Sequence, residues 1–297
     1  MVQLSIKYSP CLYCWNDPSK RWHPEDDVVF RGWSSYSTGC EGKEQWLDCG
    51  EICVLPTPQG TSWCMIEFSD VTKSYSGKLP VLAGVSFHID EGEFFYLSGV
   101  SGAGKTTIFR LLLLMELPDS GAIVYNGQEI NTYSAKERSR HRRNIGMVHQ
   151  DLDNRLLVNE TVEENIALPL RISGGTGRSV MFRVNELLER VGLEGRGKEL
   201  VKGLSGGEKQ LVSIARALVF QPPVFFADEP TGNLDQTVAY RVMELLREIH
   251  RDGSTVIVAT HDLNLIRTFR ARTLLIKDKK IQEVKLAETT HRRTKTH

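Results

Sequence analysis

The sequence predicts an α/β fold, and three features support this prediction. An apolar run at residues 94–97 and a helical pattern at 106–114 enclose a glycine-rich loop. A second apolar run, 224–227, ends in two carboxylates, as a buried strand does when it presents acids at its carboxyl end. Apolar residues recur at helical spacing over 160–203, within a chain that otherwise alternates strands and helices. We therefore expect a mixed sheet core with an antiparallel β subdomain and an inserted helical subdomain at about 155–203.

The glycine-rich loop has the spacing Gly-x-x-x-x-Gly-Lys-Thr of a phosphate-binding loop. It consists of Gly99, Val100, Ser101, Gly102, Ala103, Gly104, Lys105, Thr106 and Thr107. Backbone N–H groups that curl inward at the start of a helix bind polyphosphate. Lys105 is expected to reach the β- and γ-phosphates, and the Thr106 hydroxyl to hold Mg²⁺. The strand before the loop and the helix after it favour this interpretation over a chance glycine-rich turn.

The charges of the chain are balanced, with 37 Lys and Arg against 37 Asp and Glu, so bulk charge does not indicate a nucleic-acid partner. The longest purely aliphatic run, residues 111–115, is far shorter than the ~20 residues of a membrane span. The first 30 residues contain no apolar core of a secretory signal. We therefore expect a cytosolic chain that does not cross a membrane by itself.

Composition changes sharply near residue 64. All six cysteines and all five tryptophans precede Met65: Cys11, Cys14, Cys40, Cys49, Cys53, Cys64, Trp15, Trp22, Trp33, Trp46 and Trp63. A zinc site is one interpretation, although the gaps between the cysteines are irregular, and a disulfide module is less expected in the cytosol. We favour an extension, 1–64, that is disordered or arises from too early a start codon. Residues 65–285 then form the main domain and 286–297 a basic tail.

Local signals also predict the first sheet. Alternation predicts strands over 65–71 and 81–89, the second with Val81, Val85, Phe87 and Ile89 on one face. Asn126 and Gly127 form a strong hairpin signal after a third strand. The charged run 136–143 is expected to be the solvated face of a helix rather than a basic binding patch.

Polar residues after the later strands complete a phosphoryl-transfer site. Asp228 and Glu229 end the second apolar run, where the first acid would complete the Mg²⁺ shell and the second would polarise the attacking water. His261 follows the apolar strand 255–259, and we favour a contact with the γ-phosphate over a packing or capping role. Ser205 is expected to cap a helix that carries an apolar stripe.

In this order, the motifs resemble the nucleotide-binding subunits of ABC ATPases over about residues 65–285. The matching positions are the Walker A loop Gly99 to Thr107, the Q-loop Gln150, the signature Leu204, Ser205, Gly206, Gly207 and Glu208, the Walker B residues Asp228 and Glu229, the D-loop Asp235, the switch His261, and Tyr75 as the aromatic that stacks on adenine. The resemblance implies a head-to-tail homodimer in which ATP lies between the Walker A loop of one copy and the signature of the other. It also implies that Glu229, His261 and Gln150 act in hydrolysis, and that Thr106, Gln150 and Asp228 hold Mg²⁺.

Within that family, several segments are most similar to the cell-division FtsE family, including 142–148, 167–170 and 260–266. This similarity implies an FtsX-like integral membrane partner, possible contacts with other division proteins, no nucleic acid, and a peripheral place at the cytoplasmic face of the bacterial inner membrane. The same ATP site suits the ATPase of a lipoprotein-release or macrolide-type exporter, which stays as the alternative. A soluble ABC protein of translation or DNA repair is less expected, because the chain has one cassette and no sustained heptads.

Two features depart from the family pattern. Leu211 stands where Arg usually follows the signature, which bears on the packing of that helix. The loop from Gln150 to Thr161 is slightly longer than in typical FtsE chains, on the surface that would meet the membrane partner.

Overall fold

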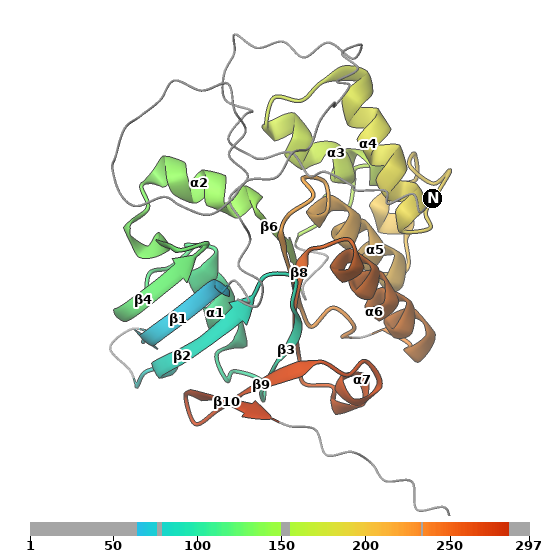
Figure 1. Cartoon of the computed structure of the whole chain (residues 1–297). Coiled ribbons are helices and arrows are strands. Elements are labelled where there is room, and N and C mark those ends of the chain that lie inside the picture. The colour runs from blue at the N-terminus through green and yellow to red at the C-terminus, as the bar shows by residue number, and fades with distance from the viewer. Residues whose placement is uncertain (1–63, 76–78, 150–154, 233, 285–297) are drawn as a thin grey trace, which may run out of the picture. The chain divides into compact units, whose positions relative to one another are not determined.

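The structure is a computed structural model that describes residues 64–75, 79–149, 155–232 and 234–284 (Figure 1). All of these residues belong to the second of two compact units, Pro58–His297. Gln150, the tail 286–297 and the zinc-ligand candidates, the pairs Cys11 with Cys14 and Cys49 with Cys53, lie outside the described residues. Cys64 is an exposed free thiol.

An antiparallel sheet in the order β2-β1-β4-β5 forms the first layer. Its strands are β1 Cys64–Lys73, β2 Leu82–Asp90, β4 Ser120–Tyr125 and β5 Gln128–Glu129. The predicted hairpin is confirmed, since Asn126 and Gly127 have φ of 48° and 74°, as a type I′ turn needs. The face predicted for β2 is wrong at its first position: Leu82, not Val81, is buried. The reason is a register shift between Val71 and Lys73 where β1 pairs with β2.

The second sheet has six strands in the order β10-β9-β3-β8-β7-β6. They are β3 Phe94–Ser98, β6 Ile145–Val148, β7 Val224–Asp228, β8 Thr255–Thr260, β9 Arg272–Lys277 and β10 Lys280–Val284. Five of the strands run parallel, and β10 returns antiparallel to β9. The predicted mixed sheet core is therefore present.

Both faces of the six-stranded sheet are covered, which explains the continuous apolar runs in its strands. Phe95 and Leu97 of β3 pack with α1 Lys105–Leu112 and the antiparallel sheet. Phe94 and Tyr96 face the opposite core, with α5 Gly206–Ala217 and α6 Gln236–Arg251. The helix predicted to reach Leu114 ends at Leu112, because Leu114 takes a left-handed backbone conformation with φ of 52°. Leu211 is buried in the same core as Phe94 and Tyr96. The leucine that replaces the usual Arg therefore packs among apolar side chains.

The predicted helical insertion comprises α3 Val162–Ile172 and α4 Gly177–Arg190, followed by the short helix η3 Val201–Gly203. Figure 1 shows α3 and α4 at the end of the described fold opposite β9 and β10. The remaining helices are η2 Ile130–Thr132, α2 Ala135–Arg143 and α7 Leu263–Thr268. As predicted, α2 is largely exposed, although its His141 is buried. Among the described helices, none has the length and apolarity that crossing a membrane requires.

Candidate functional site

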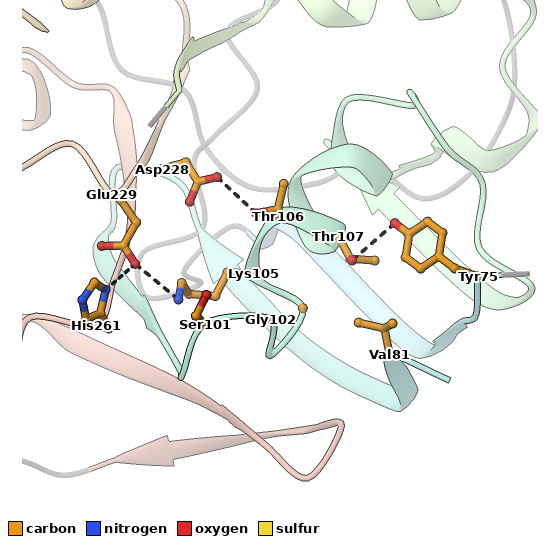
Figure 2. A pocket seen from close by; sticks show the side chains of 11 residues that line it. Tyr75, Val81, Ser101, Gly102, Lys105, Thr106, Thr107, Asp228, Glu229 and His261 are labelled. Atoms are coloured by element: carbon orange, nitrogen blue, oxygen red, sulfur yellow. Dashed lines mark hydrogen bonds and ion pairs between the residues drawn. The ribbon is translucent and has the colours of Figure 1, made fainter. Parts of the chain in front are cut away.

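The candidate site lies where neighbouring parallel strands end. In the six-stranded sheet β8 lies between β3 and β7, so the residues that follow these three strands meet at one edge. Figure 2 shows the side chains of Lys105, Glu229 and His261 pointing toward one another there. They line a cavity of about 330 Å³ together with Tyr75, Val81, Ser101, Gly102, Gly104, Thr106, Thr107 and Asp228.

The phosphate-binding loop supplies free donors to this cavity. Gly104 precedes α1 with φ of 111°, and a Cβ at this position would lie 3.0 Å from a methyl group of Leu82 and 3.1 Å from one of Val81. Among the residues that the structure describes, no side chain caps the start of α1, and the first turn of this helix contains no acid. The first N–H groups of the helix are therefore available to an anion in the cavity.

Two buried charges, with an exposed histidine next to them, lie beside the loop. The Nζ of Lys105 donates to the carbonyl oxygen of Gly99 at 2.7 Å and lies 3.3 Å from Oε1 of Glu229. The Nδ1 of His261 lies 2.8 Å from the same carboxylate oxygen. The backbone of Glu229 is left-handed, with φ of 47°, and its N–H donates to the oxygen of Ala259 at 2.8 Å. This neighbouring strand holds Glu229 in a conformation that costs about 1 kcal/mol or more.

Asp228 and Thr106 are in contact in the lining of the cavity. The Thr106 hydroxyl donates to Oδ2 of Asp228 at 3.2 Å. Burial raises the pKa of the Asp228 carboxyl, and the charge of Glu229 adds to this effect. A buried carboxylate beside a hydroxyl, both of them hard oxygen ligands, is a donor set that suits a divalent cation such as Mg²⁺.

Tyr75 lies at the rim of the cavity. Its hydroxyl donates to Oε2 of Glu116 at 2.6 Å and lies 3.4 Å from the Thr107 hydroxyl. The Nζ of Lys73 lies 5.8 Å from the centre of the ring. The ring is therefore fixed at its polar tip, next to the first turn of α1.

A family model described as ABC transporter matches residues 82–232. The chain belongs to this family. It is 45% identical over 212 residues to the cell division ATP-binding protein FtsE of Escherichia coli K12, covering 71% of this chain and 95% of that one. The FtsE of Haemophilus influenzae is 47% identical over 204 residues, covering 68% and 93%. That of Bacillus subtilis is 42% identical over 214 residues, covering 72% and 93%.

Solved ABC cassettes have the same fold. A dimeric, post-hydrolysis structure of the ATP-binding cassette MJ0796 with ADP and Pi bound matches with a TM-score of 0.68 and 34% identity, covering 75% of this chain and 99% of that one. CbiO1 of Clostridium perfringens, part of an ABC transporter complex, matches with a TM-score of 0.68 and 30% identity, covering 74% and 87%. The chain is thus an ABC-type ATPase that binds ATP.

The residues that match the signature motif lie outside the cavity. Gly206, Gly207 and Glu208 begin α5, Ser205 is the N-cap before them and Leu204 precedes that cap. None of these five residues lines the cavity. Ser205 caps the helix as predicted. A Cβ at Gly207 would lie 2.6 Å from a methyl group of Val238, so glycine permits the close contact with α6. Asp235 caps α6 by accepting from the N–H of Val238 at 3.0 Å.

Two residues of the site are not identified by any motif in the sequence. Val81 lines the cavity, and Glu116 fixes Tyr75. Val81 looked like one more position of a strand face, and Glu116 belongs to no recognisable motif. Only contacts between distant segments of the ABC fold identify them.

Proposed function

We propose that the chain is the ATP-hydrolysing subunit of an FtsEX-like membrane complex that acts in bacterial cell division. The observation that carries this proposal is the identity of 42–47% to proteins named FtsE, with 93–95% of their length covered. The family alone would leave the cellular role open, because many ABC ATPases share the same site.

The cavity supports roles for the residues of the phosphate loop. The inward backbone of Gly99 to Thr107 would hold the phosphates of ATP, with Lys105 at the β- and γ-phosphates. Thr106, Asp228 and Gln150 would hold Mg²⁺, which supplies charge neutralisation at the phosphates when bound. Tyr75 would stack on the adenine from the cavity rim.

Glu229 would act on the attacking water. It is buried, lies next to Lys105 and contacts His261 through the same oxygen. A carboxylate in this place can accept the proton of water, and His261 would contact the γ-phosphate. Gln150 would link the nucleotide site to the helical subdomain.

One chain would provide half of each ATP site. The signature is at another part of the surface, so a second copy would bring Ser205, Gly206 and Gly207 to the γ-phosphate, and Asp235 would lie at the same interface. The dimeric structures of MJ0796, at 34–35% identity, support this homodimer.

A groove beside β6 supports a docking surface for the membrane subunit. It encloses about 430 Å³ between the α2–β6 segment and the carboxyl ends of α3 and α5. Arg142, Arg143 and Arg216 line it together with the apolar Met147 and Ile172. An FtsX-like subunit would insert a short segment with apolar and acidic side chains there. Through such a contact the chain would sit at the cytoplasmic face of the inner membrane, where other division proteins could join the complex.

Co-purification tests this function. The full chain should be recovered with a four-span FtsX-like protein, and I172E should abolish recovery while ATP hydrolysis by the free chain persists. F182E, a charge at a position 75% exposed on α4 and outside the groove, is the matched control. Recovery with a lipoprotein-release permease instead would refute the division role.

That second outcome corresponds to the alternative function, the ATPase of a lipoprotein-release or macrolide-type exporter. The observation that favours it is the similarity to solved cassettes of ABC transporters. The ATP site would be the same, so only the membrane partner separates the two roles.

A further inference from the structure

Arg196 lies in the loop between α4 and η3 and reaches the amino end of the signature helix. Its guanidinium makes a bidentate contact with the Glu199 carboxylate: Nε donates to Oε1 at 2.8 Å and Nη2 donates to Oε2 at 2.7 Å. The remaining nitrogen, Nη1, donates to Oε1 of Glu208, the third residue of α5. Glu199 thus orients the Arg196 guanidinium so that its remaining nitrogen, Nη1, points at the signature.

The second carboxylate oxygen of Glu208, Oε2, accepts two hydrogen bonds from Ser205. Oε2 accepts from the backbone N–H of Ser205 at 2.8 Å and from its hydroxyl at 2.8 Å. The Arg196 hydrogen bond, followed by those of Ser205, lowers the pKa of Glu208 to about 2, so this carboxylate is ionised at neutral pH. Arg196, Glu208 and Ser205 therefore form a chain of three hydrogen-bonded side chains.

Backbone hydrogen bonds fix the loop that carries Arg196. The N–H of Glu163 donates to the oxygen of Gly197 at 2.9 Å, and the N–H of Val162 donates to that of Glu199 at 2.9 Å. A Cβ at Gly197 would lie 3.2 Å from Oε2 of Glu163, which shows how closely the loop approaches α3. The loop is thus held on the first turn of α3 while Arg196 extends to α5.

The ionised Glu208 creates a difficulty for the role proposed for the signature. An amino end of a helix attracts phosphate, but a carboxylate in its first turn repels one. The Ser205 hydroxyl also donates to Oε2 of Glu208, and it would have to turn to a γ-phosphate oxygen when ATP binds. A carboxylate whose charge is offset at Oε1 is a weaker acceptor at Oε2 and releases this hydroxyl more readily. We propose that Arg196 is a positioning residue of the signature: it holds Glu208 and neutralises its charge, so that Ser205 and the start of α5 can receive the γ-phosphate of ATP bound by a second copy.

This inference rests on the proposed function of the signature and adds a residue to it. Arg196 touches neither ATP nor the attacking water in this arrangement, since it acts through Glu208. Its effect should therefore depend on the charge of Glu208, whereas a purely structural role through Glu199 would not.

A double-mutant cycle separates these two roles. R196M removes the charge at similar length, and E208Q removes the opposing charge but can keep the helix cap, because Gln also serves at this position of a capping box. We expect R196M to lower ATP turnover roughly tenfold, and to change it less than about twofold in the E208Q background. R171M is the matched control, since Arg171 makes an ion pair with Glu164 on α3, in the same helical subdomain.

Nucleotide binding and dimer formation give the second readout. R196M should leave the affinity of the monomer for a fluorescent ATP analogue unchanged. In the E229Q background it should raise, by roughly tenfold, the ATP concentration at which dimers form in size-exclusion chromatography. Melting curves of both variants check that each one folds.

Equal loss of turnover in both backgrounds, or no loss with Glu208 present, would overturn the inference while leaving the proposed function intact. If the chain with native Arg196 formed no ATP-dependent dimer in the E229Q background, the proposed function would fail, and the inference with it.

Discussion

The Nζ of Lys105 lies 3.3 Å from Oε1 of Glu229, and both side chains are only 8% exposed. The pair joins the residue proposed to hold the phosphates to the one proposed to act on water. A buried charge of either sign is costly alone, so each compensates the other in the protein without nucleotide. A bound triphosphate would compete with Glu229 for Lys105.

K105A should abolish nucleotide binding. The variant removes the cation from the cavity, and we expect the dissociation constant for ATP to rise by at least roughly a hundredfold. Titration with a fluorescent ATP analogue measures it. K136A, which removes an exposed lysine of α2, is the control and should bind as the unmodified chain does. Unchanged affinity in K105A would remove Lys105 from the phosphate site.

E229Q should keep ATP binding and lose turnover. Glutamine has nearly the same size and can accept from His261, but it cannot take a proton from water at neutral pH. We expect phosphate release to fall about a hundredfold or more, with an ATP-bound dimer accumulating in size-exclusion chromatography. E244Q, on the exposed face of α6, provides the control. Hydrolysis at the normal rate in E229Q would assign the base to another residue.

Local sequence predicted the parts of this site that lie within short motifs. The loop before α1, the acids after β7 and His261 after β8 follow from a parallel sheet, where the residues after neighbouring strands must meet. Other features depend on distant contacts. Val81 lines the cavity because β1 and β2 shift register, and Glu116 reaches Tyr75 after α1 ends early. The packing of Leu211 could not be predicted from the sequence, because its apolar neighbours come from several distant segments of the fold.

D228N should stabilise the nucleotide-free protein while abolishing hydrolysis. Burial raises the pKa of Asp228 above its ordinary value of 3.8, so the folded state retains this proton at a pH where the unfolded chain has lost it. Stability from this group is therefore present below pH 3.8 and lost as pH rises through the raised value. At neutral pH the variant should have a free energy of unfolding higher by about 1 kcal/mol.

The pH dependence of this difference is the diagnostic measurement. The free energy of unfolding of D228N and of the unmodified chain should be measured with denaturant between about pH 3.5 and about pH 7. The difference between the two proteins should grow as pH rises and become constant near neutral pH. D119N is a control of opposite sign, because hydrogen bonds from Ser74 lower the pKa of the exposed Asp119. A D228N protein less stable than the parent at neutral pH would contradict this account.

Tyr75 should contribute to nucleotide affinity through its ring and not through its hydroxyl. Lys73 lies near the ring and Glu116 holds the hydroxyl, so the aromatic plane is fixed at the rim of the cavity before any nucleotide arrives. Stacking of a base on an aromatic ring contributes roughly 1–3 kcal/mol, so Y75A should weaken ATP binding about tenfold. Y75F keeps the ring and loses only the contacts to Glu116 and Thr107, so its affinity should change less than about twofold. Because stacking tolerates any base, GTP should bind Y75A and Y75F with the same ranking as ATP, which competition titrations can measure. Equal losses in Y75A and Y75F would show that the hydroxyl, through Glu116 and Thr107, positions the phosphate loop, and that Tyr75 makes no stacking contact.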